Sequence, residues 1–115
     1  MADARWRVVA VADFDADSRP DLLWRHTATG ELYVWLLEGT SVKAGVRLTP
    51  DRLSSSDWVL AQTADFDRDG EADLLWHNRR TGDFFVWFLS GTVVDRGSFL
   101  TPSHFSDPRW FVVPR

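Results

Sequence analysis

The chain of 115 residues contains no cysteine, which excludes both a disulfide framework and a thiolate metal site. It also lacks a run of about 18 apolar residues, the length that a membrane-spanning helix requires. The opening Met-Ala-Asp-Ala-Arg has none of the apolar core of a signal peptide. We therefore expect no membrane partner, and these features leave the localisation open.

Positive charge is scarce as well. The sequence has 13 Lys and Arg against 17 Asp and Glu, and its formal net charge is −4. Nucleic-acid binders normally carry a basic patch, so we expect no nucleic-acid partner. The chain is nevertheless 44% hydrophobic and 14% aromatic, which is too apolar for a disordered protein. Its length and composition predict a single folded domain over residues 1–115.

What the chain does contain is an internal repeat with a period of 52 residues. The period divides it into a first unit, a second unit and the opening of a third: residues 6–57, 58–109 and 110–115. Aligned without a gap, the two full units match at 23 of 52 positions. Repeats of this length are typical of propellers, solenoids and arrays, because one unit cannot bury its apolar faces alone.

Each unit contains four short runs that are rich in β-branched and aromatic residues and bounded by turn residues, which predicts four strands. We expect strands at 6–12, 21–26, 32–37 and 42–48, and again at 58–64, 73–77, 84–89 and 94–100. Thr49-Pro50 and Thr101-Pro102 should end the fourth strands, because proline cannot donate to a ladder. The central strands do not alternate polar and apolar residues, which favours sheets covered on both faces. The predicted fold is all-β, with two four-stranded antiparallel propeller blades plus one extra strand at 110–115.

One chemical motif lies between the first and second strands of each unit. Its nine-residue loops, Asp13–Asp21 and Asp65–Asp73, carry carboxylates at positions 1, 3, 5 and 9. Such close carboxylates repel unless a cation neutralises them, and oxygen ligands around a tight turn suit Ca²⁺ better than Mg²⁺. The backbone carbonyl at position 7, Arg19 or Glu71, would supply a further ligand. The alternative is a solvated acidic turn without a metal, because Asp is common in turns.

The string Ala-Asp-Phe-Asp-Arg-Asp-Gly-Glu-Ala-Asp-Leu-Leu-Trp at 64–76, followed by Thr-Gly and Val-Trp, resembles the FG-GAP/VCBS repeat family. The resemblance implies blades of an integrin-like β-propeller, a Ca²⁺ loop in each blade and an extracellular or cell-surface location. It also implies the metal ligands Asp13, Asp15, Asp17 and Asp21, and Asp65, Asp67, Asp69 and Asp73.

We expect two Ca²⁺ sites, of which the second is the stronger. Gly70 can take a positive φ without cost, whereas Ser18 at the same loop position would lose about 1 kcal/mol there. Pro20 also removes a backbone donor from the first loop.

Other residue types predict core or surface positions. Central-strand tryptophans should form the core between blades, and those that begin strands should lie at a rim, where a ring can stack on a sugar. The central-strand tryptophans are Trp24, Trp35, Trp76 and Trp87. The tryptophans that begin strands are Trp6, Trp58 and Trp110. The histidines His26, His77 and His104 show no metal-ligand spacing and are expected at the surface. Arg79-Arg80 should form a solvated hairpin tip.

The leading functional hypothesis is a non-catalytic, calcium-binding propeller fragment that self-assembles into a structural or ligand-binding scaffold. The alternative is a carbohydrate-binding, lectin-like module with a glycan between blades. A hydrolase is disfavoured because no nucleophile constellation occurs. Closed propellers have about four to eight blades, so we expect a homo-oligomer of two to four chains. The segment Arg109–Val113 would help to hold the assembly together, or is the remnant of a longer propeller.

Overall fold

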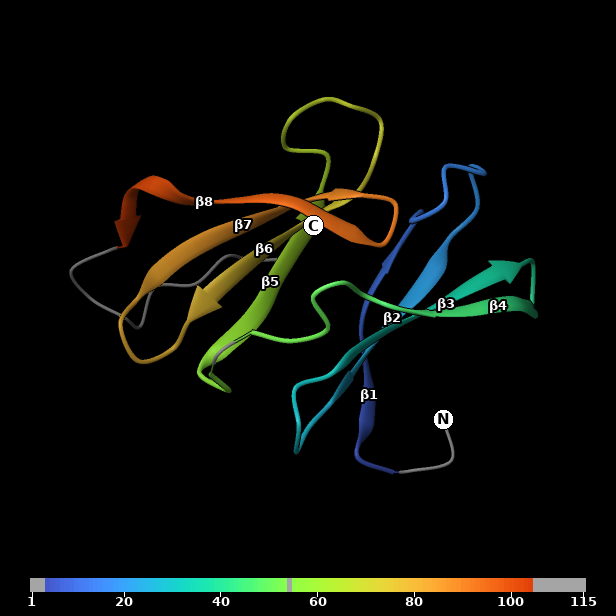
Figure 1. Ribbon diagram of the computed structural model, residues 1–115, viewed down its shortest axis with the longest axis horizontal. Coiled ribbons are helices and arrows are strands. Elements are labelled where there is room, and N and C mark those ends of the chain that lie inside the picture. The colour runs from blue at the N-terminus through green and yellow to red at the C-terminus, as the bar shows by residue number, and fades with distance from the viewer. Residues whose placement is uncertain (1–3, 54, 105–115) are drawn as a thin grey trace.

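The computed structural model describes residues 4–53 and 55–104, whose strands form two four-stranded antiparallel sheets in chain order (Figure 1). The first sheet contains β1 (Trp6–Ala12), β2 (Asp21–His26), β3 (Leu32–Glu38) and β4 (Ser41–Arg47). The second contains β5 (Trp58–Ala64), β6 (Asp73–Asn78), β7 (Asp83–Ser90) and β8 (Val93–His104). The described residues contain no helix, and therefore none long and apolar enough to cross a membrane. The predicted all-β class and both four-stranded sheets are confirmed.

The prediction for the end of the last strand is wrong. β8 does not end at Thr101-Pro102 but continues through this dipeptide to His104. Its register with β7 slips between the pairs Phe85–Phe99 and Asp83–His104, so the extra residues and the proline lie where the ladder is already irregular. The predicted extra strand at 110–115, with Trp110 and the segment Arg109–Val113, lies outside the described residues.

Two of the histidines are buried, so the prediction that they lie at the surface is wrong for them. Only 6% of His26 is exposed, and its Nδ1 accepts hydrogen bonds from the backbone N–H groups of Ala28 and Thr29, both at 3.2 Å. Asn78, 52 residues later, accepts the corresponding bonds in the second β-hairpin through its side-chain oxygen. His77 is buried and stacks on Phe84 at 4.5 Å between ring centroids. The side chain of His104 lies outside the described residues.

One apolar core joins the two sheets face to face. β1 lies beside β5, and the core takes residues from both halves of the chain. Its buried members are Phe14, Leu23, Leu32, Val34, Leu48, Leu74, Trp76, Trp87 and Leu89. The rings of Trp76 and Trp87 meet edge to face at 5.4 Å, a favourable aromatic geometry. The contact between the sheets accounts for the apolar residues on one face of each sheet, while the opposite face of the second sheet has a buried cluster of its own, Leu75, Phe84 and Val86.

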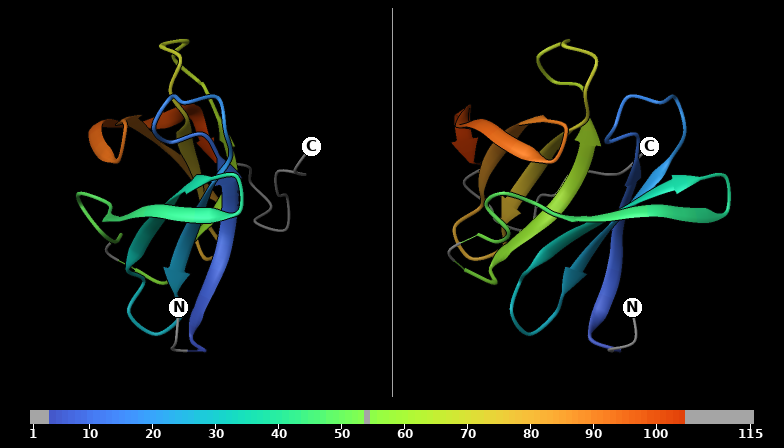
Figure 2. Two further views of the ribbon diagram at one scale, coloured as in Figure 1. Left: turned by 90° about the vertical axis from the view of Figure 1, so that its right-hand side faces the viewer. Right: turned by 45° about the vertical axis from the view of Figure 1, so that its right-hand side comes forward.

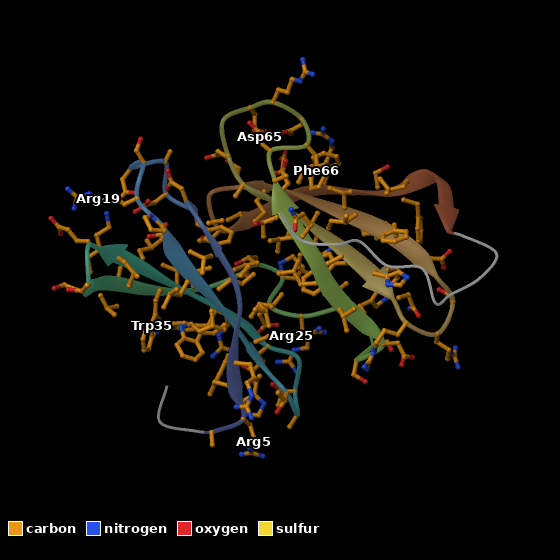
Figure 3. All side chains as sticks on the ribbon, turned by 180° about the vertical axis from the view of Figure 1, so that it is seen from behind. Arg5, Arg19, Arg25, Trp35, Asp65 and Phe66 are labelled. Carbon is orange, nitrogen blue, oxygen red and sulfur yellow. The ribbon has the colours of Figure 1, made fainter. Side chains whose placement is uncertain are left out.

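The tryptophans of the two units differ in burial although they occupy equivalent positions. Trp76 and Trp87 belong to the core between the sheets, as predicted. Trp24 and Trp35 pair at 4.9 Å but remain partly exposed, and Figure 3 shows Trp35 on the side of the first sheet that faces away from the second. Trp58 is not a free rim residue, because it packs against the core. The first sheet therefore keeps one uncovered aromatic face.

Candidate metal centres

Two acidic loops lie at the same end of the molecule. One joins β1 to β2 and the other joins β5 to β6, and both protrude beyond the same ends of the sheets (Figure 2). In each loop, four aspartates place one carboxylate oxygen apiece within 4.8 Å of the others. The two groups are Asp13, Asp15, Asp17 and Asp21, and Asp65, Asp67, Asp69 and Asp73. Within each loop, the fold thus brings together the four aspartates that the sequence analysis identified as candidate ligands.

The first aspartate of each loop bends the backbone around itself. The two carboxylate oxygens of Asp65 accept hydrogen bonds from the N–H groups of Asp69, at 3.1 Å, and Gly70, at 2.8 Å. Asp13 accepts the equivalent bonds in the first loop, at 3.3 and 2.8 Å. The N–H of Gly70 is also the main reason why the pKa of Asp65 is lowered. These bonds close a turn that keeps the carboxylates on its inner side.

The last aspartate of each loop ties the loop to the sheet. Asp73 is fully buried, and its two oxygens accept hydrogen bonds from the N–H groups of Phe66, at 3.0 Å, and Leu89, at 2.9 Å. Asp21 makes the same pair of bonds in the first unit. Each carboxylate oxygen has a second lone pair, so the clamp leaves acceptor capacity for a cation. Sequence reasoning assigned Asp21 and Asp73 only as ligands and missed this structural role.

The backbone of both loops turns through left-handed conformations. Gly70 has a φ of 87° and Ser18 a φ of 67°, which confirms the expected strain at Ser18. Ala16 and Arg68, both at φ 60°, share this conformation one position before the third aspartate. Sequence reasoning missed the second pair, because neither position carries the glycine that would have marked it.

A lysine compensates the charge of the first loop. The ammonium of Lys43, on β4, lies 3.0 Å from a carboxylate oxygen of Asp15 and 3.0 Å from one of Asp17. The bond from Lys43 lowers the pKa of Asp17, and both carboxylates raise the pKa of Lys43. Burial nevertheless raises the pKa of Asp15, although Lys43 opposes this. The Lys43 ammonium thus compensates part of the negative charge of the first loop.

The second loop has no such lysine. The position equivalent to Lys43 holds Asp95, and the guanidinium of Arg96 approaches Asp67 only to 3.6 Å while it stacks over Phe88. Burial raises the pKa of Asp67 to about 6, with smaller contributions from Asp69 and Asp73. The second loop therefore carries more uncompensated negative charge than the first.

Each loop contains one buried carboxylate oxygen without a hydrogen-bond donor, which bears on whether the loop fits a cation. Among the described residues, no hydrogen-bond donor reaches the buried Oδ1 atoms of Asp15 and Asp67, which share position 3 of their loops. A buried acceptor without a donor, beside three further carboxylates, fits a hard cation such as Ca²⁺. The side chain of Glu71 turns away and accepts a bond from the N–H of Gly91 at 3.2 Å. Ligation by the backbone carbonyls of Arg19 and Glu71 stays a prediction.

Comparisons with known proteins give one match. A family model described as an FG-GAP-like repeat matches residues 13–76, from the first aspartate of the first loop to the core tryptophan that follows the second loop. This segment of 64 residues is more than half of the 115-residue chain. Neither a curated protein nor a solved structure matches the chain.

Proposed function

Because the chain belongs to the FG-GAP-like repeat family, we propose that it is a calcium-binding β-propeller module that acts as a scaffold. The observation that carries the proposal is the pair of four-carboxylate clusters, each with one orphaned buried oxygen. The family is generally non-catalytic, and we propose no catalytic activity for this member.

Charge and coordination number favour Ca²⁺ as the bound ion. Without a cation, four carboxylates within 4.8 Å raise the electrostatic energy of each loop. Ca²⁺ accepts about six to eight oxygens in flexible geometry, which four carboxylates, one backbone carbonyl and water would provide. The second loop should bind more tightly, because Lys43 competes with the ion in the first loop and Ser18 is strained there.

Calorimetric titration with Ca²⁺ tests the proposal. We expect two sites with dissociation constants around 10⁻⁴–10⁻³ M, as in extracellular modules. Asp67→Asn should remove the tighter site and Asp15→Asn the weaker one. The matched control is Asp57→Asn, a partly exposed carboxylate that precedes β5 and lies outside both loops, which should leave both sites intact. Absence of Ca²⁺ binding in the parent, or equal loss in all three variants, would contradict the proposal.

We also propose that copies of the chain associate head to tail. Two repeat-equivalent pairs differ sharply in burial: Phe14 is 2% exposed and Phe66 is 42% exposed, while Leu48 is 1% exposed and Leu100 is 41% exposed. Phe14 and Leu48 are covered by the contact between the sheets. Phe66 and Leu100 belong to the opposite face of the second sheet, beyond which the described residues contain no further sheet. The centre of the same face of the second sheet is buried, at Leu75, Phe84 and Val86.

The uncovered face of the first sheet complements this surface. It carries Trp24, Trp35 and Val42, and the equivalents of these residues in the second sheet pack into the core between the sheets. A second copy can therefore repeat the internal contact between its own first sheet and the second sheet of its neighbour. Closure of a ring of four, six or eight blades would take two to four chains.

A mixing experiment tests the head-to-tail contact. Val42→Glu places a charge on the exposed face of the first sheet, and Leu100→Glu places one on the exposed part of the opposite face of the second sheet. Each variant alone should therefore sediment near the monomer mass of 13.2 kDa. When the two variants are mixed, the unaltered second sheet of one can contact the unaltered first sheet of the other, so they should form a heterodimer. The control is Phe99→Glu, which alters an exposed neighbour that pairs with Phe85 on the other face. A parent that is monomeric at all concentrations, or a mixture that stays monomeric, would overturn this proposal while leaving Ca²⁺ binding untouched.

The carbohydrate-binding alternative is favoured by a second observation. A pocket of about 310 Å³ is lined mainly by aromatic rings, among them Trp58, Phe85 and Phe99. Such rings can stack on the apolar face of a sugar. A glycan array in the presence of Ca²⁺ tests this alternative, and hits that disappear in Trp58→Ala would support it. An array without hits would reject the carbohydrate-binding alternative and leave the scaffold as the proposed function.

A further inference from the structure

A basic cavity lies at the end of the molecule opposite the acidic loops. It has a volume of about 700 Å³ and is lined by the hairpin that follows β2, by the connection between β4 and β5, and by Arg79. Four arginines contribute to its wall: Arg7, Arg25, Arg52 and Arg79. Threonine and serine residues contribute to the rest of the lining, together with His26 and apolar residues such as Val9 and Leu53. Such a cluster is notable in a chain whose net charge is −4.

One arginine of the cavity wall, Arg52, is neutralised by neighbouring carboxylates. Arg52 forms ion pairs with Asp51 at 3.2 Å and Glu31 at 3.9 Å. In the described part of the chain, no carboxylate forms an ion pair with Arg7, Arg25 or Arg79. Within that part, three guanidinium groups therefore contribute positive charge to the cavity without a carboxylate partner.

Arg25 is held in place by contacts across the two sheets. Its Nη1 donates to the carbonyl oxygen of Trp58 at 2.5 Å, and its guanidinium lies 5.1 Å from the ring centroid of Trp76 (Figure 3 labels Arg25 between the sheets). Burial lowers the pKa of Arg25, and the charge of Arg79 lowers it further. A guanidinium has five N–H donors, so most of them remain available. The fold thus keeps two like charges close together beside an open cavity.

We propose that this cavity binds a small organic molecule through a phosphate or sulfate group. An oxyanion of this kind can accept bidentate bonds from the guanidinium groups and relieve the repulsion between Arg25 and Arg79. The volume of about 700 Å³ lies within the range of about 300–1,000 Å³ that is usual for organic ligands. An inorganic ion alone would leave most of this space empty. The hydroxyl group of Thr27 also lines the cavity and can bind a polar group on the rest of the molecule. Those of Thr29 and Ser55 line it as well but already bond to the N–H of Glu31 and to Asp57.

The inference goes beyond the proposed calcium scaffold and does not depend on it. Titration followed by NMR compares glucose 6-phosphate, glucose 6-sulfate and neutral glucose at fixed ionic strength and fixed Ca²⁺ concentration. We expect saturable shifts at residues 27–30 and 79 with the charged sugars and none with glucose. Binding of both charged sugars identifies the shared oxyanion as the recognised group, and binding of one identifies which oxyanion is preferred. Shifts that are equal with neutral glucose would overturn the proposal.

Neighbouring arginines provide a matched pair of variants. Arg79→Met should weaken binding of the charged sugar about tenfold, because a charge-assisted hydrogen bond is lost. Arg80→Met should leave it unchanged, because the Arg80 side chain is 81% exposed, lies 3.8 Å from Asp57 and does not line the cavity. Both substitutions lie on an exposed hairpin, so both variants should fold, which circular dichroism checks. Equal weakening in the two variants would mean that the sugar responds only to overall charge, and the cavity site would be rejected.

Discussion

Replacement of Phe14 by alanine measures how strongly the two sheets hold each other. The side chain of Phe14 is 2% exposed and packs in the core between the sheets, directly after the first aspartate of the first loop. Its counterpart Phe66 follows the first aspartate of the second loop and is 42% exposed. The backbone N–H of each phenylalanine donates to the last aspartate of its own loop, and an alanine substitution keeps that bond. The pair of variants therefore isolates side-chain packing.

The expected difference follows from burial. Truncation of a buried phenylalanine to alanine costs about 3–5 kcal/mol, because the apolar contacts are lost and a cavity remains. The same truncation at the exposed Phe66 should cost less than about 1 kcal/mol in the monomer. Phe14→Ala should thus be less stable than Phe66→Ala by about 2–4 kcal/mol.

Urea unfolding at low protein concentration and saturating Ca²⁺ measures this difference. With a denaturant dependence of about 1–3 kcal/mol per M, a loss of about 3 kcal/mol shifts the midpoint by about 1–3 M. If head-to-tail association occurs, the cost of Phe66→Ala should grow with protein concentration, whereas that of Phe14→Ala should not. Equal midpoint shifts in the two variants at low concentration would refute the packing of the two sheets described above.

Further predictions concern the acidic loops. Lys43→Met should tighten Ca²⁺ binding at the first loop, since it removes the competing ammonium, and calorimetry should find the second site unchanged; unaltered affinity at the first loop would refute the competition. Ser18→Gly should raise the melting temperature by relieving about 1 kcal/mol of strain at positive φ, and a lower melting temperature would contradict this. The folded pKa of Asp67, about 6, lies above its ordinary value of 3.8, so the folded state binds this proton more tightly. In Ca²⁺-free buffer this group therefore makes stability fall as pH rises from about 4 to 6, and Asp67→Asn should flatten that part of the profile. Chelation at neutral pH should lower the melting temperature of the parent, and an unchanged melting curve would mean that the loops hold no structural ion.

Local sequence signals predicted the strands and loops because they act over a few residues. Short aromatic and β-branched runs place seven of the strands within about two residues of their observed ends. The spacing of the aspartates predicted that four carboxylates would meet in each loop, since a nine-residue turn leaves them little room to separate. The end of β8 was missed because a register slip tolerates the proline that local reasoning treats as a stop.

The sequence by itself determined the repeat, the four strands of each unit and the acidic loops, because all of these depend on neighbours along the chain. Only the tertiary structure decided which of two equivalent residues is covered, as Phe14 is and Phe66 is not. It also placed the ammonium of Lys43, on β4, against the carboxylates of the first loop and gathered Arg25 and Arg79 beside one cavity, although these residues are far apart in sequence. The physical reason is that burial and charge compensation depend on how the sheets stack. Two units with the same local pattern therefore acquire different surroundings.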